Sequence, residues 1–269
     1  MPHFIRRLLV LPLLALALGA ANLAHAQARE EYRVLTAAEV LDELRGQRDD
    51  VIPERLMQRA YAVAVIPDVT KVAFVVGGRY GRGVMVVRDA KGRFSNPVFV
   101  SITGGSVGWQ IGAQSTDIVL VFTTRRGVEG LAGGKLTLGA GASVAAGPVG
   151  RQGEAAAGLD AEVFSYSRNR GLFAGVSLDG TAITIDNKSN GVFYKRSGVL
   201  ASEIMSGTVT KDSENVRRLL SAVTASTGES AAQTTTGVAP AAPHSPAPAP
   251  TSGVRTFPME DQKPGAEPR

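Results

Sequence analysis

Short apolar runs, rich in β-branched and aromatic residues, follow one another from Ala62 to about Arg196. Glycine-containing turns separate them, and 24 of the 31 glycines lie between Gly77 and Gly198. A spacing of about ten residues per strand favours an antiparallel sheet over alternating strands and helices. The runs are VAVIP (63–67), KVAFVVGG (71–78), GVMVVRD (83–89), NPVFVSIT (96–103), VGWQIGAQ (107–114), DIVLVFTT (117–124), KLTLGAGASVAAG (135–147), AEVFSYSR (161–168), GLFAGVSL (171–178) and TAITID (181–186).

Helical spacing of apolar residues brackets this region. Thr36 and Glu39 predict a capping box for a helix that ends near Gly46, and Pro53 lies in the first turn of a second helix. A last helix is predicted at 211–224, capped by Asp212 or Ser213. The predicted fold is therefore β-rich α+β: an antiparallel sandwich or barrel-like core of short, glycine-linked strands, with helices at both ends.

The two ends of the chain differ from this body. Residues 1–26 have a basic start, an apolar stretch of about 14 residues and a small-residue cleavage pattern, and so predict a signal peptide cleaved near Ala26. Residues 226–269 are rich in proline and alanine and predict a disordered tail. We therefore expect a domain at 27–225 in a protein that is periplasmic or secreted.

Composition excludes several classes of function. The chain has no cysteine, and after cleavage its one histidine is His244, in the tail. Ser106 lies in a G-x-S-x-G pattern, but no histidine of the body can act as its base. We therefore expect no catalytic residues, no metal site, no cofactor and no enzyme activity. The body carries a net charge of only +4, so nucleic acid is not an expected partner.

An acidic and amide-rich run from Asp186 to Gly191 resembles the start of a calcium loop. Lys188 stands at the third ligand position, however, and its charge would repel the cation. A β-turn built from asparagine and glycine is the better interpretation.

Basic residues beside glycine turns are the remaining candidates for a binding site. Glycine lets backbone N–H groups approach an anion closely, and arginine offers forked donors matched to phosphate. The candidate headgroup-binding residues are Lys71, Arg79, Arg82, Arg125, Arg126, Arg151, Arg168 and Arg170. The second predicted helix supplies candidate membrane-contacting residues: Arg55, Leu56, Met57 and Arg59.

Four blocks of the sequence closely resemble the SYLF-domain family: VAVIPDVTKVAFVVGGRYGRGVMVV (63–87), GGSVGWQIGAQSTDIVLVF (104–122), GGKLTLGAGASVAAGPVGR (133–151) and SYSRNRGLFAGVSLDG (165–180). The resemblance extends over about residues 35–208. It implies a non-enzymatic lipid-binding module: eukaryotic members bind phosphoinositides through an amphipathic N-terminal helix and basic residues, and some fungal members bind actin filaments.

The predicted function is docking on anionic, phosphate-bearing lipid, such as phosphatidylglycerol, cardiolipin or lipid A. Three or four basic residues contribute only about 3–4 kcal/mol at an anionic surface, so apolar contacts must add to them. The alternative is an envelope protein-interaction or structural module that uses the proline- and alanine-rich tail as a tether. A membrane-spanning barrel shares the strand rhythm, but the terminal helices and the tail do not fit one, and we expect no integral membrane protein.

Overall fold

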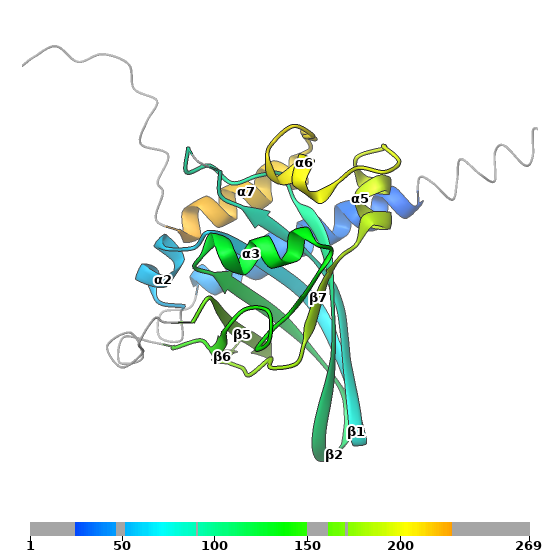
Figure 1. The fold of residues 1–269 in the computed structure, drawn as a ribbon, viewed down its shortest axis with the longest axis vertical. Helices are drawn as coiled ribbons and strands as arrows, with labels where there is room; N and C mark the ends of the chain where they lie inside the picture. The colour runs from blue at the N-terminus through cyan, green and yellow to red at the C-terminus, as the bar shows by residue number, and fades with distance from the viewer. Residues whose placement is uncertain (1–24, 47–51, 90, 150–160, 170–171, 228–269) are drawn as a thin grey trace, which may run out of the picture. The chain divides into compact units, whose positions relative to one another are not determined.

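The computed structural model describes residues 25–46, 52–89, 91–149, 161–169 and 172–227. These residues form a sheet with helices on both of its faces (Figure 1). The predicted β-rich fold with helices at both ends is confirmed. Of the predicted signal peptide and the predicted tail, the structure describes only His25, Ala26, Ser226 and Thr227. Arg151 and Arg170 also lie outside the described residues.

Two long strands build the centre of the sheet. β1 (Ala62–Val87) and β2 (Val98–Phe122) pair in antiparallel register, from Ala62 opposite Phe122 to Met85 opposite Val98. The prediction of short strands was wrong here, because three predicted runs belong to β1 and three to β2. Pro67 does not end the strand, since the register shifts between Ile66 and Val69 and a bulge accommodates the proline.

β1 folds back across itself, and two glycines permit the close approach. A Cβ atom on Gly83 would lie 2.1 Å from the carbonyl oxygen of Val65 and 2.6 Å from Cα of Ile66. A Cβ atom on Gly81 would lie 2.7 Å from Cγ2 of Val69. Residues 65–69 and 81–83 are therefore in contact, which curls the β1–β2 ribbon.

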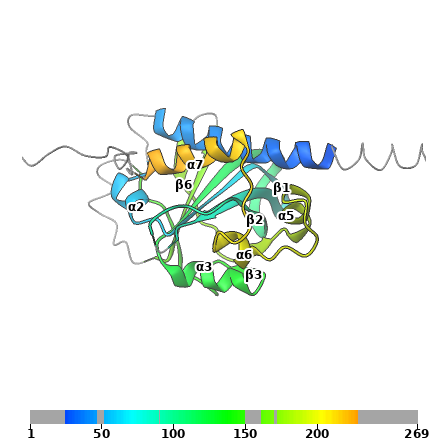
Figure 2. The same ribbon diagram turned by 90° about the horizontal axis from the view of Figure 1, so that it is seen from above.

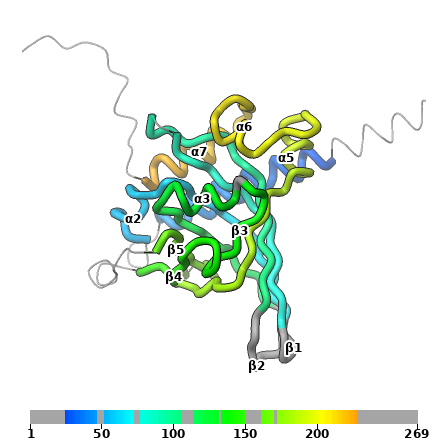
Figure 3. The backbone as a smooth tube through the Cα atoms, in the orientation of Figure 1, coloured from blue at the N-terminus to red at the C-terminus, as the bar shows by residue number. Residues whose placement is uncertain are grey.

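Five shorter strands extend the sheet in the order β3-β7-β2-β5-β4, with β1 on β2 and β6 on β5. The early part of β2 pairs with β7, and its late part pairs with β5. The sheet is mixed, because β4 runs parallel to β5. Figure 3 shows β4 and β5 near each other, below α3. The bounds are β3 Lys135–Thr137, β4 Val144–Ala146, β5 Val163–Asn169, β6 Leu172–Gly175 and β7 Ala182–Ile185.

Helices cover the sheet in two layers (Figure 2). The N-terminal helix, described over residues 25–46, lies beside α7 on one face, and α3 and α6 cover the other. The remaining bounds are α2 Glu54–Gln58, α3 Arg125–Ala132, α5 Asn187–Phe193, α6 Ala201–Met205 and α7 Glu214–Ser226.

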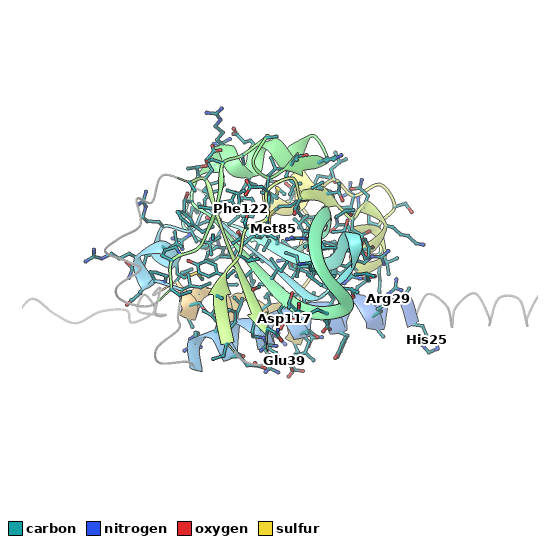
Figure 4. The ribbon with its side chains drawn as sticks, turned by 90° about the horizontal axis from the view of Figure 1, so that it is seen from below. His25, Arg29, Glu39, Met85, Asp117 and Phe122 are labelled. Atoms are coloured by element: carbon teal, nitrogen blue, oxygen red, sulfur yellow. The ribbon has the colours of Figure 1, made fainter. Side chains whose placement is uncertain are left out.

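Alternate residues of the long strands fill two separate cores. Val63 and Val65 face the N-terminal helix and α7, whereas Ala64 and Ile66 face α3 and α6. Met85 and Phe122 also belong to the core under α3 (Figure 4). Because both faces are buried, the strands read as continuous apolar runs in the sequence.

Helix ends were predicted with mixed success. Ser213 caps α7 by accepting a hydrogen bond from the backbone N–H of Val216, as one of the two predicted caps. Thr36 caps nothing: it lies inside the N-terminal helix, and its hydroxyl donates to the carbonyl oxygen of Tyr32. The β-turn predicted after Asp186 was also wrong, because Asp186 caps α5 through the backbone N–H of Ser189.

Candidate functional site

A pocket of about 320 Å³ lies between the N-terminal helix and β1. The helix contributes residues one turn apart, which share a face: Arg29, Tyr32, Arg33 and Thr36. β1 contributes the segments 67–70 and 80–82, which the folding back of the strand brings together. We call this the arginine–tyrosine pocket, after Arg29, Arg33, Arg82, Tyr32 and Tyr80.

Arg33 holds the floor of the arginine–tyrosine pocket in place. Its guanidinium lies 2.9 Å from the Glu30 carboxylate and 3.8 Å from that of Asp186, and it stacks 5.4 Å from the centre of the Phe99 ring. Burial lowers the pKa of Arg33, and the two carboxylates partly offset that effect. Arginine stays charged under all ordinary conditions. The carboxylates of Glu30 and Asp186 therefore compensate the charge of Arg33 within the protein.

Arg29 and Arg82 are the solvent-facing cations of the pocket. Arg29 is 61% exposed, near the beginning of the helix (Figure 4), and lies 3.5 Å from Glu30. Arg82 donates a hydrogen bond to the Tyr80 hydroxyl, which raises the pKa of Arg82, and its guanidinium lies 5.8 Å from the centre of that ring. Both groups can therefore meet an anion from outside.

The two tyrosines are unusually exposed for large side chains. Tyr32 is 64% and Tyr80 47% exposed, and Val72 on β1 is 54% exposed. A phenol ring has an apolar body and a polar tip, which suits a boundary between water and a less polar phase. The pocket therefore offers cationic and aromatic groups side by side, with Asp68 as the acidic residue of its lining.

Of the predicted headgroup-binding residues on β1, Arg82 lines this pocket, whereas Arg79 and Lys71 do not. Arg79 turns toward Ser177, and its guanidinium lies 3.5 Å from that carbonyl oxygen. Burial lowers the pKa of Arg79. Lys71 lies earlier on β1 and is partly buried.

Arg125 and Arg126 lie on α3, across the sheet from the N-terminal helix. The prediction of a glycine loop at this point was wrong, because Thr124 caps a helix by accepting from the backbone N–H of Gly127. Arg125 pairs with Glu129 at 2.7 Å, and Arg126 lies 3.7 Å from Glu162. The predicted basic residues therefore form two groups rather than one face.

Arg168 has a positioning role. Its guanidinium lies 2.6 Å from the Asp117 carboxylate and also pairs with Glu43 of the N-terminal helix. Asp117, labelled in Figure 4, in turn accepts a hydrogen bond from the backbone N–H of Asp68 at 2.9 Å, beside the bulge of β1. Arg168 thus ties the helix to β2 and β5, and its side chain is only 19% exposed.

The predicted membrane-contacting segment is α2, and half of it faces inward. Leu56 and Met57 are 0% and 2% exposed in the core beneath the N-terminal helix. Neither can reach a membrane in this arrangement, which contradicts their predicted role. Arg55 and Arg59 are exposed.

The acidic face of the N-terminal helix contacts the C-terminal part of the domain. The Glu31 carboxylate pairs with Lys211 at 2.5 Å and accepts hydrogen bonds from Ser213 and Asn215. Burial raises the pKa of Glu31. These donors and the Lys211 charge together lower that pKa by more, so its net shift is downward. Glu39 and Asp42 lie within 4.0 Å of Arg218 on α7.

The described part of the chain contains neither a candidate metal site nor a candidate membrane-spanning helix. Its His, Asp and Glu side chains form no cluster of three that could hold a metal ion. None of its helices combines the length and apolar character needed to cross a membrane.

Sequence reasoning missed Arg29, Tyr32, Arg33 and Tyr80 as pocket residues. The Thr36 and Glu39 pattern predicts a helix that begins at Thr36, whereas the described helix already includes residues 25–35. Tyr80 stands between Arg79 and Arg82 in a glycine-rich run, and that alternation was the available signal.

The model of the Ysc84 family, described as "Las17-binding protein actin regulator", matches residues 103–226. Residues 103–226 therefore match a Ysc84-type (SYLF) domain.

Curated relatives are named after YSC84 or after LAS seventeen. The chain is 36% identical over 186 residues to SH3 domain-containing YSC84-like protein 1 of Xenopus laevis, covering 66% of this chain and 55% of the relative. It is 39% identical over 166 residues to the human protein of that name, covering 59% and 48%. It is 39% identical over 166 residues to LAS seventeen-binding protein 3 of Saccharomyces cerevisiae, covering 60% and 36%. The chain thus spans about half or less of these relatives, and no solved structure matches it.

Proposed function

We propose that the chain is a binding module for anionic, phosphate-bearing lipid headgroups and that the arginine–tyrosine pocket is its contact site. One observation carries the proposal: Arg29 and Arg82 stand exposed beside the exposed rings of Tyr32 and Tyr80. Guanidinium groups match phosphate oxygens as forked donors. Tyrosine rings favour the level of the headgroups, where one end of the ring is wet and the other is not.

The expected affinity is modest. Two arginines near an anionic surface contribute about 2 kcal/mol, and partial burial of two rings adds about 3 kcal/mol. The sum of about 5 kcal/mol corresponds to a dissociation constant of a few hundred micromolar. Phosphatidylglycerol, cardiolipin and lipid A all present the phosphate that this chemistry requires.

Co-sedimentation with vesicles tests the proposal. The full 27–269 chain is mixed with vesicles of phosphatidylcholine alone or of phosphatidylcholine with phosphatidylglycerol, at low and high salt. We expect binding to the anionic vesicles that weakens with salt, because screening reduces the attraction between exposed charges.

A matched pair of charge reversals locates the site. Arg29→Glu with Arg82→Glu should weaken binding at least tenfold. Lys135→Glu with Lys188→Glu changes the net charge equally at exposed positions outside the pocket and should weaken binding less than threefold. Equal losses in both variants, with both shown folded by circular dichroism, would reduce the effect to net charge and reject the pocket.

We also propose that the chain is exported and cleaved after Ala26, which gives a periplasmic or secreted protein. Such a cleavage removes only His25 and Ala26 from the described helix. The contacts that hold the helix begin at Arg29 and Glu30, so they remain in the mature chain. N-terminal sequencing of the protein from the periplasmic fraction tests the position.

A further inference from the structure

The β1–β2 ribbon has an end that extends away from the helices (Figure 1). Residues 65–69 and 81–83 of β1 are in contact, so the strand turns back between these two segments. β2 stays paired with β1 throughout, and Val75 lies opposite Gly108 near the middle of the turned-back stretch. We call residues 72–78 and their partners 105–113 the ribbon end.

The ribbon end is rich in apolar residues. β1 contributes the run VAFVV (72–76), and β2 contributes Val107, Trp109 and Ile111. None of the described side chains of residues 70–83 and 103–116 belongs to either hydrophobic core. At the border of this stretch, Val72 is 54% and Tyr80 47% exposed. Apolar residues gathered outside a core usually mark an interaction site.

The charge of this part of the ribbon is entirely positive. Residues 69–87 of β1 contain Lys71, Arg79 and Arg82 and no carboxylate, and residues 98–116 of β2 contain no charged residue. Arg79 donates to a carbonyl oxygen and Arg82 to a hydroxyl, and these neutral acceptors do not cancel the two charges. Two ribbon ends of this charge repel each other, whereas a membrane with anionic headgroups attracts them.

One face of the ribbon joins this end to the arginine–tyrosine pocket. Thr70, Tyr80 and Arg82 line the pocket. Val72 follows Thr70 by two positions on β1, and alternate residues of a strand share a face. A surface that meets the pocket from this side therefore also meets Val72.

We infer that the ribbon end enters the boundary between headgroups and hydrocarbon of an anionic membrane. This inference rests on the proposed function and adds an apolar contact to the headgroup contact of the pocket. The insertion is shallow, because among the described strands residues 104–116 of β2 pair only with β1, which leaves the outer edge of β2 without a partner there. Unpaired backbone groups do not occur in lipid-exposed hydrocarbon.

Fluorescence of Trp109, the only tryptophan of the chain, tests the inference. The full 27–269 chain is bound to an excess of phosphatidylcholine–phosphatidylglycerol vesicles. Their acyl chains carry bromine near the headgroup, bromine near the chain end, or no bromine, and bromine quenches tryptophan only at close range. We expect bromine near the headgroup to lower Trp109 emission by about a third or more, and bromine near the chain end to lower it less, because tryptophan favours the interface.

A matched pair of neutral variants tests the apolar contact without changing the net charge. Val72→Gln should weaken vesicle binding in co-sedimentation at least threefold, because its apolar side chain no longer leaves water on binding. Leu200→Gln replaces a side chain that is 60% exposed just before α6, away from the ribbon end, and should change binding less than twofold.

The outcomes separate this inference from the proposed function. Vesicle binding with the same Trp109 emission in brominated and plain vesicles overturns the inference alone, as do equal affinities of Val72→Gln and Leu200→Gln. Unchanged vesicle affinity and quenching in Arg29→Glu with Arg82→Glu would support insertion and reject the pocket. Binding to no vesicle overturns both. A blue shift of Trp109 emission that grows with protein concentration in the absence of vesicles would assign the ribbon end to a second copy of the chain instead.

Discussion

Replacing Gly83 with alanine tests the folding back of β1. The added Cβ atom would lie 2.1 Å from the Val65 carbonyl oxygen and 2.6 Å from Cα of Ile66, and both are backbone atoms that cannot rotate away. The two segments must separate by more than 1 Å to reach ordinary contact of about 3.4 Å. Overpacking of this kind costs about 1–3 kcal/mol, and a backbone clash lies at the upper end. We therefore expect Gly83→Ala to lower the free energy of unfolding by about 3 kcal/mol.

Gly78→Ala is the matched control on the same strand. Its Cβ atom would meet only the Gly104 carbonyl oxygen, at 4.0 Å. Neither glycine has a positive φ, so backbone strain does not separate the two variants. Thermal unfolding of the full chain should show a Tm lowered by about 6–12 °C for Gly83→Ala and nearly unchanged for Gly78→Ala. Urea unfolding should rank the stabilities of the two variants in the same order. Equal stability of the two variants would refute the contact between residues 65–69 and 81–83.

Three further changes probe buried polar contacts. Arg168→Ala should cost about 3 kcal/mol in urea unfolding, because it leaves the Asp117 carboxylate buried without its partner, and adding Asp117→Asn should restore part of that loss. Asn190→Ala should cost about 1–3 kcal/mol, because its side-chain oxygen accepts the Phe99 N–H at 2.9 Å, whereas Asn190→Asp keeps an acceptor and should cost less. The pKa of Glu31 is lowered below 4.5 in the folded state, so its stabilisation is complete above pH 4.5 and is lost as the pH falls through the lower value. Glu31→Gln should therefore be less stable than the unchanged chain at pH 6, and a gap that persists undiminished in strong acid would contradict this origin.

The sequence pattern predicted the class of fold because apolar alternation and glycine spacing are local signals. It divided β1 and β2 into short strands because Pro67 and the glycines near Gly77 and Gly83 usually mark turns. In the structure Pro67 lies at a bulge, and Gly83 serves a contact with a distant part of its own strand. Neither use leaves a local trace, since each depends on what the strand meets after folding.

The candidate site was predicted less well than the fold. Arg82 was identified from its glycine neighbours, and it does line the pocket. Arg168 has the same local context, yet it is occupied by Asp117 and Glu43, which lie far away in the sequence. A basic residue in a glycine-rich run therefore indicates a possible anion contact, and only the tertiary partners decide whether its charge is available.

The contacts of Glu31 on the N-terminal helix with Lys211, Ser213 and Asn215 have a consequence for how the chain folds. The β1–β2 ribbon can close from Met85 and Val98, 13 positions apart, and ends at Ala62 and Phe122, 60 positions apart. Glu31 and Ser213 are separated by 182 positions. Contacts of such separation carry the largest loop-closure cost and form late. The N-terminal helix is thus the first element of the described domain to be synthesised and among the last to dock. Its apolar face stays exposed to other chains until α7 packs beside it.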